Sequence, residues 1–179
     1  VLMGGFSAER EVSLSSAQGV IKALHELGHE VLPIDVTRDM AQLVKNLSDA
    51  RPDVVLNILH GRWGEDGCIQ GLLEMMDLPY SNSGVLGSAL SMNKVVARTI
   101  CQINGIVVPE GKVASLTDVC AGRVMKPPYV IKPIGEGSSV GVSIVMDENS
   151  SLPSPQEWAF ENEVLVERYI PGREIQVAV

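Results

Sequence analysis

The segment VIKPIGEGSSVGVSIV, Val130 to Val145, predicts two β-strands joined by a loop rich in glycine and serine. Gly135, Gly137 and Gly141 can adopt backbone angles that are closed to other residues, and they let main-chain N–H groups approach a ligand. Lys132 ends the first strand, and alternation along the strand turns its ammonium toward the space that the loop covers. This composition is typical of a loop that covers phosphate. It also fits a plain β-hairpin with a flexible tip and a solvated lysine.

Around this hairpin, the second half of the chain consists of short β-rich runs joined by turns rather than by long helices. Pro171 and Gly172 form the centre of a tight turn between two antiparallel strands, and the polar, Pro-rich residues 148–158 predict a surface loop. We therefore expect an α+β domain with an antiparallel sheet. The β-rich runs are Val107, Tyr129–Lys132, Val140–Met146, Val164–Ile170 and Ile175–Val179.

The first half alternates strands with helices, an order that predicts a parallel sheet with crossover helices. The boundary between the two domains falls at residues 91 and 92, where Ser91 is a good N-cap for a helix that Gly105 ends. The predicted strands are Val1–Met3, Val31–Ile34 and Val54–Leu59, and the predicted helices run from about Ser13 to Leu27, Asp39 to Leu47, Ile69 to Met76 and Met92 to Asn104.

Composition excludes several classes of function. The net charge is -8, and no segment gathers the Lys/Arg cluster that a nucleic-acid surface needs. No apolar run approaches the roughly 18 residues of a membrane span. Three cysteines lie far apart in helical patterns, without a CxxC pair, so we expect reduced core thiols in a cytoplasmic protein. Both ends of the chain fall inside predicted strands, so we expect both to be cut.

Two loops follow predicted strands of the first domain, and in an open α/β sheet such loops meet ligands. The first contains Glu9 and lacks the GxGxxG dinucleotide fingerprint. An acid there suits an ammonium, although charges near a helix N-terminus are often only surface charges. The second loop, HGRWGEDG, begins with His60, which we expect close to Glu9. A lone histidine is often structural; neither a zinc motif nor a GxSxG elbow accompanies it.

Charged residues in the second domain suggest a nucleotide. Lys94 in the first turn of its helix and Lys132 at the end of its strand could bracket a polyphosphate. Glu167 and Glu174 flank the RYIPGR turn, whose backbone is free to read the edge of a base. The alternative is that these two acids are solvated charges beside a hairpin turn.

Taken together, these segments resemble the D-alanine–D-alanine ligases of the ATP-grasp superfamily. The matching stretches are GGFSAEREVSLSSA, LHGRWGEDGCIQGLLEMMDLPYSNSGVLGSALSMNK, VIKPIGEGSSVGVSIV and EVLVERYIPGREIQVAV. The resemblance implies an α/β fold with a Rossmann-like parallel-sheet domain over residues 1–91, which binds substrate, followed by part of an α+β ATP-grasp domain over residues 92–179. It also implies a reaction in which ATP phosphorylates one D-alanine and a second D-alanine attacks the acyl phosphate, in peptidoglycan synthesis.

The resemblance assigns a role to each candidate residue. In the first domain it places Glu9 at the ammonium of the first D-alanine and His60 near the carboxylate. Ser138 would tie the glycine-rich loop to Glu9, and Ser139 with the loop amides, including Glu136 and Gly137, would cover the transferring phosphate.

For ATP the resemblance implies a second set of contacts. Lys94 and Lys132 would contact the phosphates, and Glu167 the adenine amino group. The backbone from Arg168 to Ile170 would contact the edge of the adenine ring. Glu174 would bind the ribose hydroxyls.

Other parts of the reaction are expected outside this sequence. The resemblance places the Mg2+ ligands, an oxyanion arginine and a mobile loop beyond residue 179, so the chain as given is expected to be inactive. It also suggests a homodimer through the first domain. A D-alanine–D-lactate ligase, another ATP-grasp carboxylate-amine ligase, and a non-catalytic nucleotide-binding module are the alternatives.

Overall fold

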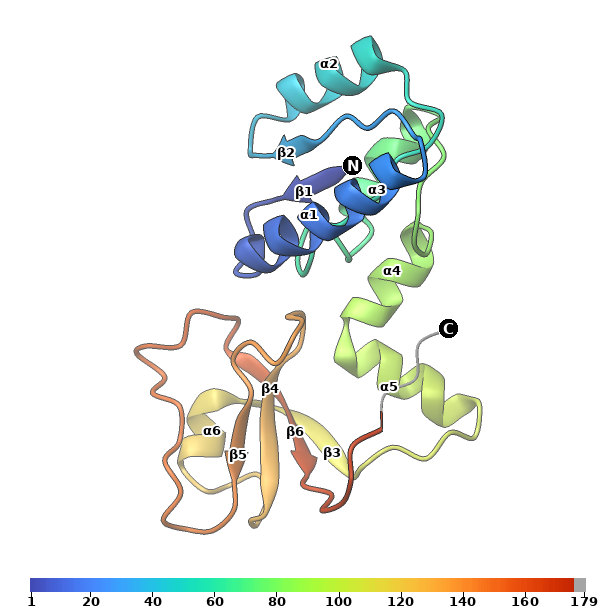
Figure 1. The fold of residues 1–179 in the computed structure, drawn as a ribbon. Helices are drawn as coiled ribbons and strands as arrows, with labels where there is room; N and C mark the ends of the chain where they lie inside the picture. Colours follow the sequence, from blue (N-terminus) through green and yellow to red (C-terminus); the bar gives the residue numbers. More distant parts are fainter. Residues whose placement is uncertain (176–179) are drawn as a thin grey trace. The chain divides into compact units, whose positions relative to one another are not determined.

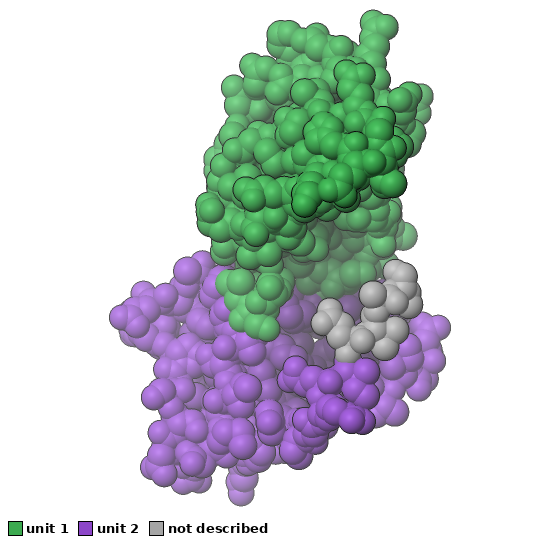
Figure 2. Space-filling model, in the orientation of Figure 1, with its two compact units in different colours: residues 1–93, 135–140 green, residues 94–134, 141–179 purple. Residues whose placement is uncertain are grey.

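The computed structural model describes residues 1–175, which form two compact units (Figures 1 and 2). The first contains residues 1–93 together with the glycine-rich loop 135–140. The second contains residues 94–134 and those from 141 onward. The fold is mixed α/β, with a small parallel sheet in the first unit and a four-stranded antiparallel sheet in the second.

The parallel sheet of the first unit pairs β1, Leu2–Gly4, with β2, Ile34–Val36. The predicted third strand is present only as isolated parallel bridges, from Leu2 to Asn57 and from Val55 to Tyr80. A ladder does not develop there because side chains replace part of it: the Asn57 N–H donates to the Ser81 hydroxyl at 2.9 Å. The predicted parallel sheet is confirmed, and the prediction of a regular strand at 54–59 is wrong.

Helices cover this sheet, and their apolar faces make the core. Ser13, fully buried in α1, accepts from the Gly4 N–H at 2.9 Å and donates to the Ile58 carbonyl at 2.6 Å, so it ties the helix to two parallel segments. The helices are α1 (Arg10–Glu26), α2 (Met40–Ala50), α3 (Cys68–Met75) and α4 (Val85–Met92). The buried core consists of Leu2, Ile34, Val36, Leu43, Leu47, Val55, Leu59, Ile69 and Leu73.

The helix expected from Met92 to Asn104 is divided in two. Ser91 lies inside α4, and Asn93 interrupts the helical path with extended backbone angles of φ -82° and ψ 102°. The next helix, α5, is Lys94–Ile103. The predicted N-cap is therefore wrong, because the apolar run before it already forms a helix. Gly105, at φ +75°, ends α5 as predicted.

The sheet of the second unit has the strand order β3-β6-β4-β5, and every neighbouring pair is antiparallel, as predicted. The strands are β3 (Gly111–Ser115), β4 (Tyr129–Pro133), β5 (Ser143–Val145) and β6 (Glu163–Arg168), and a short helix α6 (Leu116–Cys120) packs on one face. Its core includes Leu116, Val119, Tyr129, Ile131, Val145, Val164 and Val166.

Of the remaining predictions for the second unit, one is wrong and one is confirmed. Val107 is 95% exposed and lies outside any strand, because the strand begins later, at Gly111. Residues 148–158 contain no helix or strand, as predicted for a surface loop. Of the strand expected from Ile175 to Val179, all but Ile175 lies outside the described residues.

All three cysteines are free thiols within helices, but Cys68 is exposed rather than in the core. In the described part of the chain, no helix is both long enough and apolar enough to span a membrane.

Candidate functional site

Glu9 occupies the N-cap position of α1 without using its side chain as a cap. The residue is only 7% exposed, and its Oε2 atom has no hydrogen-bond partner among residues 1–175. A buried carboxylate oxygen without a donor is costly, because it has lost its water and gained nothing in return. The Oε2 atom of Glu9 is therefore able to accept a hydrogen bond from a ligand.

Two glycines leave room around this carboxylate. A Cβ atom on Gly61 would lie 2.3 Å from Glu9 Oε2, and one on Gly137 would lie 3.0 Å from it. Gly61 also has a φ of +67°, which disfavours any larger residue there. The backbone of two loops thus approaches the acid closely, and glycine at both positions leaves this space open.

His60 is held beside Glu9 by Ser7. The Ser7 hydroxyl donates to the His60 carbonyl at 2.8 Å and accepts from the Glu9 N–H at 3.2 Å. The structure therefore brings together the two residues that the sequence predicts to be neighbours. The Nε2 atom of His60 is buried and, like Glu9 Oε2, has no hydrogen-bond partner in the described part of the chain.

The loop that carries His60 is fixed by residues that sequence reasoning missed. Asn57 and Gln70, both buried, donate their side-chain amides to the Gly64 carbonyl at 2.8 and 2.9 Å. Glu65 accepts from the Gly61 N–H at 2.6 Å and lies 3.8 Å from His60 Nδ1. Polar residues in otherwise apolar patterns, such as Asn57 within VVLNIL, were the available signal.

Of the charges beside Glu9, Arg10 does not belong to this site. Its guanidinium forms two hydrogen bonds to Asp35, at 2.8 and 2.7 Å, and a third to the Gly5 carbonyl at 2.9 Å. The hydrogen bond from Arg10 lowers the pKa of Asp35 below its ordinary value. This arginine is therefore a structural contact between α1 and β2.

The glycine-rich loop has a different backbone from the one predicted. Positive φ angles occur at Ser138 (45°) and Ser139 (62°), whereas of the three loop glycines only Gly141 has one, at 70°. Gly137 leaves space beside Glu9 and does not use a positive φ angle. The expected hydrogen bond from Ser138 to Glu9 Oε2 is not formed in the described residues. Both serines are exposed, and Glu136 is half-buried.

In the second unit, Glu167 is 5% exposed and binds two cations. Lys132 Nζ donates to its Oε2 at 2.6 Å, and the guanidinium of Arg98 donates to its Oε1. The interpretation of Glu167 as a solvated charge is therefore wrong. Lys132 does share its half-buried face of β4 with Val130, but its ammonium is ion-paired rather than directed into an empty cleft.

Arg98 is the residue that sequence reasoning missed in this cluster. It lies four positions after Lys94 on α5, so the two side chains share one face of the helix. The Lys94 N–H donates to the Ile134 carbonyl at 3.1 Å, which anchors the start of α5 at the end of β4. The two predicted lysines therefore belong to adjoining ends of two elements.

In the described residues, the segment after β6 leaves backbone donors open. The Arg168 N–H donates to the Glu110 carbonyl at 2.8 Å and the Tyr169 N–H to the Pro128 carbonyl at 3.2 Å. The Ile170 N–H makes no hydrogen bond within residues 1–175, and its side chain is 63% exposed. Glu174 is also exposed. The described residues contain no group of three or more His, Cys, Asp or Glu that could hold a metal ion.

Comparisons with known proteins give a consistent result. Two family models match: "D-ala D-ala ligase N-terminus" over residues 1–52 and 41–83, and "D-ala D-ala ligase C-terminus" over residues 107–179. The chain is 51% identical over 180 residues to a D-alanine–D-alanine ligase of Paramagnetospirillum magneticum, and the match covers 100% of this chain and 58% of that protein.

Solved structures agree with these matches. A D-alanine–D-alanine ligase from Bacillus anthracis complexed with ATP has a TM-score of 0.74 at 31% identity, covering 96% of this chain and 58% of that one. The VanG D-Ala:D-Ser ligase from Enterococcus faecalis has a TM-score of 0.69 at 27% identity, covering 96% and 62%. The chain thus spans less than two thirds of the length of these relatives.

Proposed function

The chain belongs to the D-alanine–D-alanine ligase family, and from this premise we propose that it supplies the first D-alanine site and much of the ATP site of such an enzyme. The reaction joins two D-alanines to D-alanyl-D-alanine through an acyl phosphate, in cytoplasmic synthesis of peptidoglycan precursors. Residues 1–91 form the Rossmann-like substrate domain, and residues 92–179 form part of the ATP-grasp domain.

One observation carries this proposal: a buried carboxylate oxygen on Glu9 without a donor. An ammonium is the complementary group, because it supplies several N–H donors and a positive charge to the same oxygen. Gly61 and Gly137 keep side chains away from that oxygen, so a small amine can reach it. His60 lies beside it, through Ser7, with a buried ring nitrogen that can contact the carboxylate of the same amino acid.

The glycine-rich loop fits a role over the transferring phosphate. Gly137 lies in the same compact unit as Glu9 and approaches its carboxylate, so the loop begins beside the proposed amino-acid site. Ser138 and Ser139 are exposed and offer two hydroxyl donors, and the amides of Glu136 and Gly137 add to them. When the loop closes over ligand, the hydroxyl of Ser138 would donate a hydrogen bond to the Glu9 carboxylate.

The second unit supports the proposed contacts with ATP. The free N–H of Ile170 can donate to the edge of adenine, next to the Arg168 backbone, and Glu174 can accept from ribose hydroxyls. Glu167 is already ion-paired, so an adenine amino group would share that carboxylate with Lys132. We expect the Lys132 ammonium to turn toward the phosphates, where Lys94 also lies, when nucleotide binds.

The metal site and the dimer follow from membership of the family. We assign the Mg2+ ligands and the oxyanion arginine to the portion of these enzymes that corresponds to no residue of this chain. When bound, Mg2+ would neutralise the phosphate charge. A homodimer through the first domain is proposed on the same basis. The three free cysteines agree with a reducing cytoplasm.

Two alternatives remain as proposals. A ligase that takes D-lactate as its second substrate would need the same Glu9 site, because only the second substrate differs. A nucleotide-binding module without turnover would have no use for a buried acid aimed at an ammonium. The Glu9 carboxylate therefore favours an amino-acid ligase over the module.

The test is the Glu9→Gln variant of the complete enzyme. Loss of a charge-assisted hydrogen bond costs about 1.5 to 3 kcal/mol, so the Michaelis constant for the first D-alanine should rise about ten- to a hundredfold. The Michaelis constant for ATP should change far less. Glu11→Gln is the matched control, since Glu11 is an exposed acid in the first turn of the same helix. Equal effects of Glu9→Gln on both substrates would contradict the proposal.

A further inference from the structure

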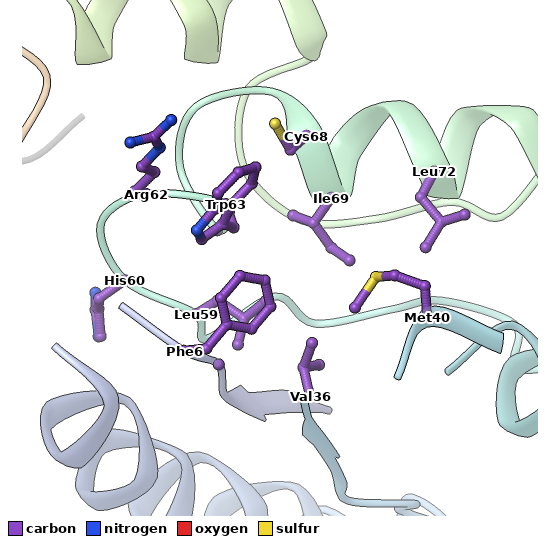
Figure 3. Close-up of a pocket in the computed structure, with 12 residues that line it drawn as sticks. Phe6, Val36, Met40, Leu59, His60, Arg62, Trp63, Cys68, Ile69 and Leu72 are labelled. Carbon is purple, nitrogen blue, oxygen red and sulfur yellow. The ribbon is translucent and has the colours of Figure 1, made fainter. Parts of the chain in front are cut away.

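A cavity lies in the first unit, and Glu9 does not line it. Its volume is about 160 Å³, and most of its wall is apolar (Figure 3). The side chains of Phe6, Met40, Ile69 and Leu72 face one another across it, and Trp63 closes one end. A dry apolar cavity of about 150 Å³ is large enough to hold benzene. The cavity therefore accommodates a group the size of one aromatic ring.

The position of the cavity is one where open α/β sheets bind ligands. Its wall includes Gly5 and Phe6, just after β1, and the loop from Leu59 onward, just after the segment that bridges to β1. β2 pairs with the opposite side of β1, so the order of the parallel segments reverses here. Loops diverge at such a reversal and leave a crevice at the carboxyl ends of the strands.

Two guanidinium groups stand over the aromatic rings of the wall. The Arg38 Cζ atom lies 4.5 Å from the centroid of Phe6, and Arg62 Cζ lies 4.8 Å from the Trp63 ring. The two rings are 5.5 Å apart, so both cations are at the same aromatic pair. Neither arginine forms a salt bridge with a carboxylate in residues 1–175.

Asp66, in the same loop as Arg62, does not neutralise the two arginines by forming an ion pair with either of them. Asp66 accepts from the Trp63 N–H at 2.9 Å through one oxygen and from the Cys68 N–H at 3.1 Å through the other. Its carboxylate is therefore engaged with the backbone of the loop. In a chain with a net charge of -8, these two arginines without carboxylate partners put local positive charge beside an apolar cavity.

We propose that this cavity binds a small aromatic carboxylate, with the ring among the apolar side chains and the carboxylate at Arg38 and Arg62. The apolar wall contributes through burial of the ring, and the two guanidinium groups select the charge of the ligand. The inference does not depend on the proposed ligase activity. His60 is the one residue that lines this cavity and also lies beside Glu9.

The experiment uses the fluorescence of Trp63. The chain has two tryptophans, so Trp158→Phe leaves Trp63 as the only one. Four probes separate ring from charge: phenylacetate, benzyl alcohol, benzylamine and acetate. We expect phenylacetate to change the emission of Trp63 saturably, benzyl alcohol to bind at least about threefold more weakly, benzylamine more weakly still, and acetate to give no response over the same range.

Variants test the proposed contacts. In the Trp158→Phe background, Arg38→Gln with Arg62→Gln should weaken phenylacetate binding about threefold or more and leave benzyl alcohol unchanged. Arg51→Gln is the control, since Arg51 is exposed and lies outside the cavity wall. Circular dichroism verifies that each variant is folded.

Three results would overturn the proposal. Equal binding of the three ring compounds would show an apolar cavity without charge selection. A response to acetate equal to that of phenylacetate would show an anion site that does not use the cavity. No saturable response of Trp63 to phenylacetate in the folded chain would show that the cavity takes no such ligand.

Discussion

Replacement of Arg98 by methionine should destabilise the second unit far more than replacement of an exposed arginine. The Arg98 side chain is 13% exposed and binds Glu167, whose side chain is 7% exposed. It also donates to the Pro109 carbonyl at 2.7 Å. Arg98→Met leaves a buried carboxylate with Lys132 as its one remaining cationic partner, and it leaves the carbonyl without this donor.

The magnitude follows from burial. Removal of one partner from a buried ion pair costs about 3 to 5 kcal/mol, because the remaining charge is desolvated without compensation. Lys132 stays 2.6 Å from Glu167 and compensates in part, so we expect the lower end, about 3 kcal/mol. Arg123→Met is the control: Arg123 is 73% exposed, and its pair with Asp118 should contribute less than about 1 kcal/mol.

Urea unfolding measures the difference, followed by Trp158, which packs on the core of the second unit. A Trp63→Phe background removes the signal of the first unit, so the measured transition belongs to one unit. Arg98→Met combined with Glu167→Met should cost less than the sum of the single changes by about 2 kcal/mol. If Arg98→Met and Arg123→Met differed by less than about 1 kcal/mol, the buried pair would not be a main support of this unit.

Three further expectations concern ligand, turnover and pH. Lys132→Ala in the complete enzyme should weaken ATP binding by calorimetry and, because Lys132 binds buried Glu167, also lower the free energy of unfolding; unchanged nucleotide affinity would remove the lysine from the ATP site. A polypeptide of residues 1–179 should release no ADP with D-alanine and Mg2+, whereas turnover would place the metal site within these residues. The lowered pKa of Asp35 means that its bond with Arg10 stabilises the fold above the unfolded-state pKa of about 3.9 and that this contribution is lost as pH falls through the lower folded-state pKa. Both side chains are over a third exposed, so the difference in unfolding free energy between the parent chain and Arg10→Gln should be small at neutral pH. It should shrink in acid, where Asp35 is protonated and only the hydrogen bond from Arg10 to the Gly5 carbonyl remains; a difference that did not shrink in acid would contradict it.

Residues with strong local signals were predicted well from the sequence. Gly105 ends α5 because a helix commonly ends with a residue in the left-handed region, and glycine adopts it freely. Strands β4 and β6 lie within predicted β-rich runs, and β4 pairs antiparallel with β5 across the glycine-rich loop, as a hairpin would. The proximity of Glu9 and His60 followed from the rule that loops after parallel strands meet at one sheet edge.

Features that depend on partners distant in sequence could not be predicted in this way. Arg98 pairs with a residue 69 positions away, and nothing near it in the chain indicates that partner. The break at Asn93 divides what reads as one helical pattern, and no proline or glycine beside it in the sequence marks the break. Gly137 was expected to have special backbone angles and to let the main chain approach a ligand, but the nearest group to its Cβ position is the side chain of Glu9, which the sequence places 128 positions earlier.

The backbone of the glycine-rich loop carries a trade-off between stability and chemistry. Ser138 and Ser139 hold left-handed angles, where an L-residue pays about 1 to 2 kcal/mol that glycine avoids. Selection for folding alone would therefore place glycine at both positions, as it does at Gly141. The two serines therefore hold their hydroxyls on a backbone that glycine would adopt at lower cost, which fits the proposed role of these hydroxyls over phosphate. If the proposal is right, a double replacement by glycine would make the protein harder to unfold and weaken its hold on phosphate.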